Sequence, residues 1–190
     1  MGDGSNPPPL QELIVEIDRN VMLGTRGLPA CGLGKIKSAN TSQALKACRP
    51  ALVGEGKTNV EVPYHAPLLP WSKLLAFNGG VKDGKSTLYI HSYLVAPVSA
   101  SLVMTVAVLK IHNGRYGVKL DISIPPIAKG SGFVRKFQLN LFRRFAYRHK
   151  KQSFVKARCF DGKLQAKAAW IFLEAPPLAG TLKRPCTVKG

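Results

Sequence analysis

Four cysteines are the residues whose chemistry is easiest to define from this sequence. Cys31 and Cys48 enclose a short segment near the start of the chain, and Cys159 and Cys186 enclose another near its end. Neither pair has the Cys-x-x-Cys spacing of zinc ligands or thiol redox sites. Local pairs of this kind are typical of disulfides, which persist in oxidising compartments. The alternative is four buried free thiols in a reducing compartment.

Two segments have the spacing of a phosphate-binding P-loop. Residues 79–86, GGVKDGKS, fit the pattern G-x-x-x-x-G-K-[ST] in full, and residues 51–58, ALVGEGKT, fit a looser form. In a P-loop the lysine, here Lys85, reaches the phosphates and the hydroxyl, here Ser86, binds Mg²⁺. This chemistry needs a helix directly after the loop. Both segments are followed by residues typical of strands, so we expect hairpin loops and keep nucleotide binding as a remote alternative.

The segment 143–151, RRFAYRHKK, is the strongest binding candidate. Its aromatic residues Phe145 and Tyr147 have the chemistry to stack on bases or sugars while the cations hold anionic groups. The structural alternative is that both aromatics form the inward face of a strand and that 148–151 is a charged hairpin turn. Cations on strand faces also discourage edge-to-edge aggregation. The candidate polyanion-binding residues are Arg143, Arg144, Arg148, Lys150 and Lys151, with an extension through Arg135, Lys136, Lys156, Arg158 and Lys167.

Patterns of catalytic and metal-binding residues are missing from the sequence. The four histidines are scattered without an i, i+4 pair, and the ten carboxylates show no paired arrangement. No G-x-S-x-G nucleophile motif occurs. We therefore expect no enzymatic activity, no metal site and no cofactor.

The net charge of +18 is concentrated in the second half of the chain. From Lys110 onward there are 18 Lys and Arg residues against three carboxylates. Such a field attracts anionic polymers, among them nucleic acid, acidic polysaccharide and cell-wall polymer. The alternative is that the charge serves solubility alone.

Hydrophobic residues make up 45% of the 190 residues, which is enough for a packed core. The longest apolar run, 102–109, is far shorter than the ~20 residues of a membrane-spanning helix. No signal peptide is present, so an exported protein would appear here in its mature form. We expect a flexible leader at 1–9 and a single β-rich domain at 10–190.

Residues 10–56 are expected to form an N-terminal strand, loop and helix. Leu13, Val15 and Ile17 alternate with polar residues, as in a strand. The helix is expected at 41–49, capped by Asn40 or Thr41, and a Cys31–Cys48 bridge would staple it to the preceding loop.

The remainder of the chain has the turn signals of an all-β protein. Asn78-Gly79, Asp83-Gly84, Asn113-Gly114 and Asp161-Gly162 separate alternating segments, and the last joins 153–160 and 163–172 in an expected hairpin. The fold class is therefore mainly β, an antiparallel sandwich or barrel-like domain with a disulfide-stapled N-terminal helix. The expected strands are 57–62, 72–77, 87–94, 102–111, 116–124, 133–141, 153–160, 163–172 and 178–188.

A set of short segments spread along the sequence carries a resemblance to other proteins. The segments are TRGLPAC at 25–31, ALKAC at 44–48, ALVGEG at 51–56, LAFNG at 75–79, LYIHSY at 88–93, IHNGRYG at 111–117, ARCFDG at 157–162 and GTLKRPC at 180–186. Together they resemble uncharacterised exported proteins of actinobacteria, and the similarity covers nearly the whole chain after the leader. The resemblance implies export by a signal peptide, a β-rich domain and disulfides, with no assigned activity. Relatives of this kind share the Phe-Asn-Gly turn but not the Gly-Lys-Ser that follows it here, and the basic segment 133–151 departs from their pattern.

These observations predict a non-enzymatic exported protein of the cell envelope or extracellular space, with a binding or structural role. The alternative is a polyanion-binding module that uses the basic second half of the chain.

Overall fold

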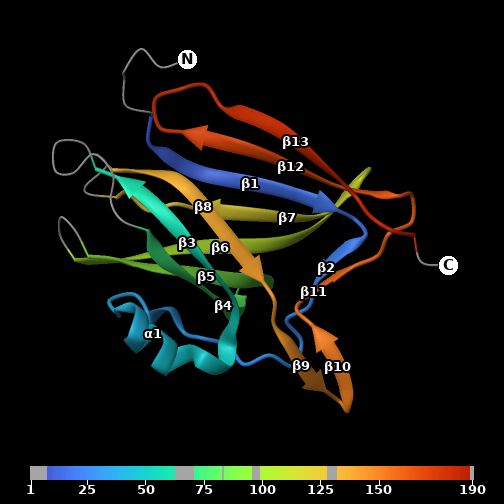
Figure 1. The fold of residues 1–190 in the computed structure, drawn as a ribbon, viewed down its shortest axis with the longest axis horizontal. Coiled ribbons are helices and arrows are strands. Elements are labelled where there is room, and N and C mark those ends of the chain that lie inside the picture. Colours follow the sequence, from blue (N-terminus) through green and yellow to red (C-terminus); the bar gives the residue numbers. More distant parts are fainter. Residues whose placement is uncertain (1–7, 63–70, 83, 96–98, 128–131, 189–190) are drawn as a thin grey trace.

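The computed structural model describes residues 8–62, 71–82, 84–95, 99–127 and 132–188 (Figure 1). Residues 1–7 of the expected leader therefore lie outside the described part. Within these ranges, nine antiparallel strands form one curved sheet, a half-barrel, in the order β13-β12-β1-β7-β6-β5-β4-β3-β8. The strands are β1 (Leu10–Asp18), β3 (Leu52–Glu61), β4 (Ser72–Lys82), β5 (Lys85–Leu94), β6 (Ala100–Asn113), β7 (Tyr116–Ser123), β8 (Phe133–Leu141), β12 (Lys163–Phe172) and β13 (Leu178–Pro185).

Two small two-stranded sheets accompany the half-barrel. In one, β2 (Val21–Leu23) pairs with β11 (Val155–Ala157). In the other, β9 (Arg144–Tyr147) pairs with β10 (Lys150–Ser153), and this hairpin projects away from the half-barrel (Figure 1). The mainly β, barrel-like fold expected from the sequence is thus confirmed.

The expected helix is also confirmed. α1 (Thr41–Cys48) lies between two single 3₁₀ turns, Leu33–Lys35 and Arg49–Ala51. Asn40 caps it: its side-chain oxygen accepts from the backbone N–H of Gln43 at 2.9 Å, and the Gln43 side chain accepts from the Asn40 N–H at 2.9 Å. This reciprocal capping box satisfies two backbone donors at the start of the helix.

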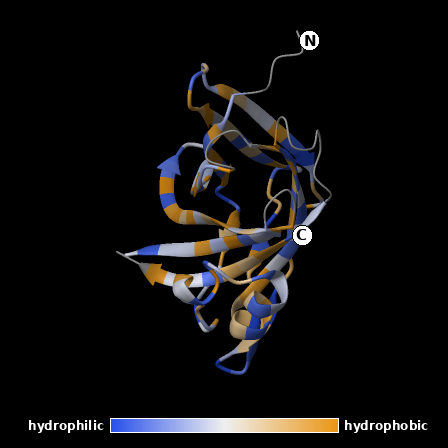
Figure 2. Ribbon diagram, turned by 90° about the vertical axis from the view of Figure 1, so that its left-hand side faces the viewer, coloured by the Kyte–Doolittle hydropathy of each residue, from blue (hydrophilic) through white to orange (hydrophobic). Residues whose placement is uncertain are grey.

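The central strands β4 and β5 are buried on both faces of the sheet. Leu74, Ala76, Leu88 and Ile90 face the inside of the half-barrel, whereas alternate residues face the outside. The alternation of hydrophobic and hydrophilic residues along the peripheral strands is visible in Figure 2. The inner core cluster consists of Val53, Leu74, Ala76, Leu88, Ile90, Met104, Val106, Ile122 and Phe154.

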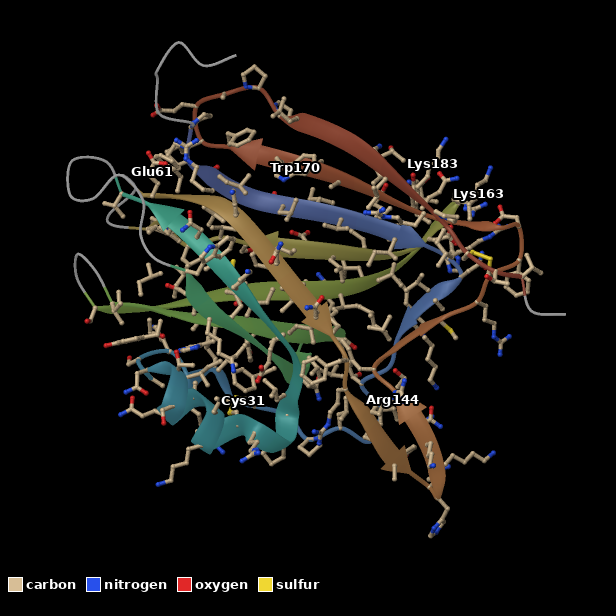
Figure 3. All side chains as sticks on the ribbon, viewed as in Figure 1. Cys31, Glu61, Arg144, Lys163, Trp170 and Lys183 are labelled. Carbon is tan, nitrogen blue, oxygen red and sulfur yellow. A yellow bond between two sulfur atoms is a disulfide. The ribbon has the colours of Figure 1, made fainter. Side chains whose placement is uncertain are left out.

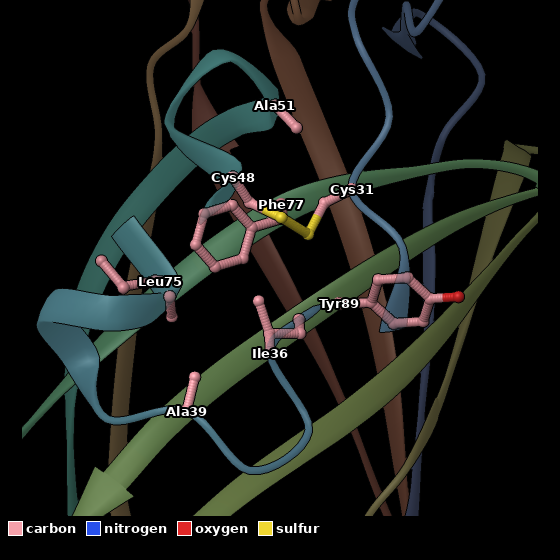
Figure 4. Packing of buried hydrophobic residues seen from close by; sticks show 9 residues of the cluster. Cys31, Ile36, Ala39, Cys48, Ala51, Leu75, Phe77 and Tyr89 are labelled. Atoms are coloured by element: carbon pink, nitrogen blue, oxygen red, sulfur yellow. A yellow bond between two sulfur atoms is a disulfide. The ribbon is translucent and has the colours of Figure 1, made fainter. Parts of the chain in front are cut away.

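The outer face of β4 and β5 is covered by α1 and by the loop before it (Figure 4). Leu75, Phe77 and Tyr89 pack there against the expected Cys31–Cys48 disulfide, whose Cα atoms are 5.4 Å apart. The second expected disulfide, Cys159–Cys186, joins the segment before β12 to the end of β13, with Cα atoms 5.9 Å apart. Both pairings expected from the sequence are present.

The hairpin expected around Asp161-Gly162, between 153–160 and 163–172, does not form, so this prediction was wrong. β12 pairs with β1 and β13, whereas the preceding segment contributes only the short β11, which pairs with β2. Phe154 is fully buried in the inner core and Val155 packs against it. Burial of Phe154 and the pairing of β11 with β2 keep the segment from lying beside β12.

Candidate anion-binding surface

The β9–β10 hairpin carries four of the five residues predicted from the sequence to bind a polyanion. Tyr147 pairs with Lys150 and Ala146 with Lys151, so Arg148 and His149 form a two-residue turn. Both turn residues have positive φ, 50° and 61°. Two-residue hairpin turns of this kind favour Asn and Gly, because a Cβ is strained in the left-handed region. A cation and an imidazole occupy these strained positions at the tip of the hairpin.

The two faces of the hairpin differ in exposure. Phe145 and Tyr147 are half-buried, whereas Arg144 and Lys151 are exposed. Tyr147 lies against Gly27, where an added Cβ would lie 2.3 Å from the tyrosine ring. Gly27 also has a φ of 86°, so both its backbone conformation and this close approach require glycine. The predicted inward face of the strand is confirmed, although the turn is narrower than the expected 148–151.

Four cationic side chains of the hairpin point into solvent without a carboxylate partner among the described residues. These four, which we call the basic hairpin surface, are Arg144, Arg148, Lys150 and Lys151. The guanidinium of Arg148 lies 5.5 Å from the centroid of the Tyr147 ring. Figure 3 shows nitrogen-ended side chains extending outward from this part of the molecule, with Arg144 near its base.

The fifth predicted residue, Arg143, has a different position. It is half-buried just before β9, and its backbone carbonyl accepts from the N–H of Phe154 at 2.8 Å. Its Nε is buried and has no hydrogen-bond partner in the described structure. Arg143 therefore belongs to the base of the hairpin and not to its exposed surface.

A cavity of about 650 Å³ lies beside the basic hairpin surface. Arg144 and Lys151 line it together with Phe145, Gln152, Ser153 and Lys156. The ammonium of Lys156 donates to the side-chain oxygen of Gln152, a neutral partner. Three cations, an amide and a hydroxyl around one concave surface are suited to phosphate, sulfate or carboxylate groups.

Of the cations expected to extend the patch, Arg135 is engaged elsewhere. It donates to Glu61 and lies 5.0 Å from the centroid of the Phe133 ring. Sequence reasoning did not identify Gln152, Ser153 or Gly27 as parts of this surface, since none of them carries a charge or a motif.

The P-loop-like segment 79–86 forms the end of β4 and the start of β5. Lys85 and Ser86 are the first residues of β5, in an antiparallel hairpin in which Lys85 pairs with Lys82 of β4. Adjacent strand residues point to opposite faces of a sheet, so these two side chains cannot meet at one phosphate. β5 continues to Leu94 where a P-loop requires a helix. The expected hairpin is confirmed at 79–86, although Asp83 lies outside the described residues. At 51–58 the expected hairpin loop is wrong, because that segment leaves the 3₁₀ turn at Ala51 and continues as β3.

Buried polar groups elsewhere have structural contacts. His91 is fully buried, with Nε2 at 2.8 Å from the carbonyl oxygen of Ala39 and 3.1 Å from Oγ of Ser101. Burial lowers the pKa of His91 below its ordinary value. In the described ranges, no three His, Cys, Asp or Glu side chains gather as metal ligands would.

A second polar network ties together the ends of three strands. Arg115 donates from Nε to the fully buried Asp18 at 2.7 Å and from its terminal nitrogens to Asp161. Asp18 also accepts from the N–H of Asn20 at 3.0 Å and of Gln165 at 3.1 Å. The hydrogen bond from Arg115 lowers the pKa of Asp161 to about 2.

No protein-family model matches the chain, and no curated protein or solved structure shows significant similarity to it. The helices in the described part of the chain lack the length and apolar character needed to cross a bilayer. The fold and surface together define a disulfide-linked antiparallel half-barrel with a projecting basic hairpin.

Proposed function

We propose that this chain is a non-enzymatic exported protein that binds an anionic polymer on its β9–β10 hairpin. The observation that carries the proposal is the basic hairpin surface: four exposed cations on a projecting hairpin, none with a carboxylate partner in the described ranges. A polymer with repeated negative charges suits such a surface because several weak contacts form together.

The charge pattern around the hairpin supports this proposal. Between Asp121 and Asp161 the sequence has ten Lys and Arg residues and no carboxylate. The positive field of the hairpin is therefore not compensated by its own chain neighbours. A field of one sign concentrates anionic partners near the surface and accelerates their association.

The orientation of the aromatic residues favours an acidic polysaccharide or cell-wall polymer over nucleic acid. Stacking on unpaired bases needs exposed aromatic faces. Phe145 and Tyr147 are half-buried, and Tyr147 packs against Gly27. The exposed face instead presents Arg144 and Lys151 on either side of the small Ala146, which suits recognition of anionic groups rather than bases.

Export is supported by the two disulfides, since such bonds persist in oxidising compartments. The resemblance to exported actinobacterial proteins points in the same direction. An extracellular or cell-envelope location also brings the protein to acidic polysaccharides and cell-wall polymers.

The test is a salt titration of binding to heparin, single-stranded DNA and neutral dextran. In the hairpin variant, Arg144, Arg148, Lys150 and Lys151 are all replaced by Gln. The control variant removes the same charge from four exposed cations around α1: Lys35, Lys37, Lys46 and Arg49. We expect heparin to bind more tightly than DNA and dextran not to bind.

For heparin, the hairpin variant should reduce the magnitude of the slope of log association constant against log salt concentration by about three. The control variant should keep most of the slope. Equal losses in the two variants would show that net charge alone drives binding and would contradict the proposal.

A further inference from the structure

A second cavity, of about 680 Å³, lies at the end of the half-barrel between β2 and the β6–β7 hairpin. Its volume falls in the range of about 300–1,000 Å³ that is usual for small-molecule sites. Neither the disulfides nor the basic hairpin surface accounts for it.

The walls of this cavity are largely apolar. The apolar lining includes Val21 and Leu23 of β2, Val108 and Ile111 of β6, and Val118 of β7. Leu23 and Val108 also pack against the inner core cluster. The cavity is therefore an open continuation of the inner hydrophobic face, and its apolar walls can accept a hydrocarbon chain.

Cations surround the apolar walls. Arg19, Lys110 and Lys156 line the cavity, and no carboxylate does so among the described residues. The described hydrogen bonds from these cations go to uncharged oxygens: Arg19 donates to the carbonyl of Gly114 at 3.5 Å, and Lys156 donates to Gln152. The nearby carboxylate of Asp18 is already paired with Arg115. Positive charge at the cavity is thus left for a ligand.

We propose that this cavity binds a single-chain amphiphile with an anionic head group, such as a fatty acid or an alkyl phosphate. The hydrocarbon chain lies against the valine and leucine side chains, and the head group contacts the cationic lining. Ser86, which the sequence offered as a nucleotide ligand, also lines this cavity and supplies a hydroxyl. This inference goes beyond polymer binding, although Lys156 lines both cavities.

Calorimetric titration with octanoate, decanoate and dodecanoate tests the apolar part of the proposal. Burial of two further methylenes should tighten binding about 15-fold for each step in the series, as long as the chain stays within the cavity. Affinity that does not change with chain length would overturn the proposal.

The head group is tested by comparing decanoate and decyl phosphate with decanol. Tighter binding of either anion than of the alcohol supports the proposal and shows which head group is preferred. Equal affinity for all three would overturn it, because the cations would then play no part.

Variants locate the site. Lys110→Met with Lys156→Met keeps the apolar stems and removes both charges, so the preference for decanoate over decanol should fall at least tenfold. Lys35→Met with Lys183→Met removes two exposed lysines that do not line the cavity and should leave the preference unchanged. Met22→Glu adds a carboxylate to the wall and should weaken decanoate more than Met22→Gln does.

The four-residue hairpin variant keeps Lys156 and should bind decanoate like the wild type, which separates this proposal from polymer binding. Unchanged preference in the Lys110→Met, Lys156→Met variant would overturn the assignment of the site. A circular dichroism spectrum of each variant shows that the fold is retained.

Discussion

Removing the Cys31–Cys48 disulfide is expected to cost more stability than removing Cys159–Cys186, although it closes the shorter loop. The sequence separations are 17 and 27 residues. Loop-closure entropy alone gives about 3.1 kcal/mol for the first bridge and about 3.6 kcal/mol for the second. On this term by itself, the C-terminal bridge would stabilise the protein slightly more.

Burial reverses the order. Cys31 and Cys48 are only 1% and 3% exposed and lie in the outer core cluster beside Phe77, whereas Cys159 and Cys186 are half-buried. Replacing each buried cysteine with alanine removes roughly one methylene equivalent of apolar burial, about 1 kcal/mol, and leaves a small cavity. The double variant Cys31→Ala, Cys48→Ala should therefore lose about 5 kcal/mol, and Cys159→Ala, Cys186→Ala about 3.6 kcal/mol.

Urea unfolding of both double variants under identical conditions measures these losses by linear extrapolation to water. The fully reduced wild type serves as the reference for loss of both bridges. A Cys159→Ala, Cys186→Ala variant that loses as much stability as the other, or more, would refute the argument from burial.

Three further substitutions probe other parts of the half-barrel. Because burial lowers the pKa of His91, the unfolded chain binds a proton at this residue more readily than the folded chain does. The free energy of unfolding should therefore fall as the pH drops below about 6.5, and His91→Gln should flatten this pH dependence, as measured by urea midpoints. Arg115→Met leaves the buried carboxylate of Asp18 without a cation, which should cost about 3 kcal/mol in thermal or urea unfolding, and adding Asp18→Asn should recover part of that loss. Gly27→Ala should displace Tyr147, weaken heparin binding several-fold and lower the free energy of unfolding by about 1–3 kcal/mol. Gly34→Ala should change neither measurement appreciably, because a Cβ added there meets no other atom within 4 Å.

The fold followed from the sequence where the pattern is local. Asn40 and Gln43 have the three-residue spacing of a capping box. The Asn113-Gly114 signal marks the β6–β7 hairpin, although Asn113 pairs with Tyr116 and the turn itself is Gly114-Arg115. The pairing of the segment after Ser153 was predicted wrongly, because alternation indicates a strand but not which strand it pairs with. Burial of Phe154 in the inner core fixes the position of this segment. That burial depends on residues more than 100 positions away in the chain, such as Leu23.

Of the candidate site, only the cationic residues could be predicted from the sequence. The run 143–151 is visible in the sequence, and the structure places four of its cations on one hairpin. The contact between Gly27 and Tyr147 and the cavity beside Lys156 were not predictable, because they join segments far apart in the chain. A glycine in a loop gives no indication of which side chain will pack against it.

The cations of this protein differ in how far the fold itself explains them. Edge strands β8 and β13 carry Arg135, Lys136, Lys183 and Arg184, which protect long exposed edges from pairing with another chain. Strands β9 and β10 have only four residues each, and strands this short are poor templates for such pairing. Protection of an edge therefore does not require the dense charge of the hairpin. The charge of the basic hairpin surface exceeds what folding and edge protection require, and the anionic partner proposed above would account for the excess.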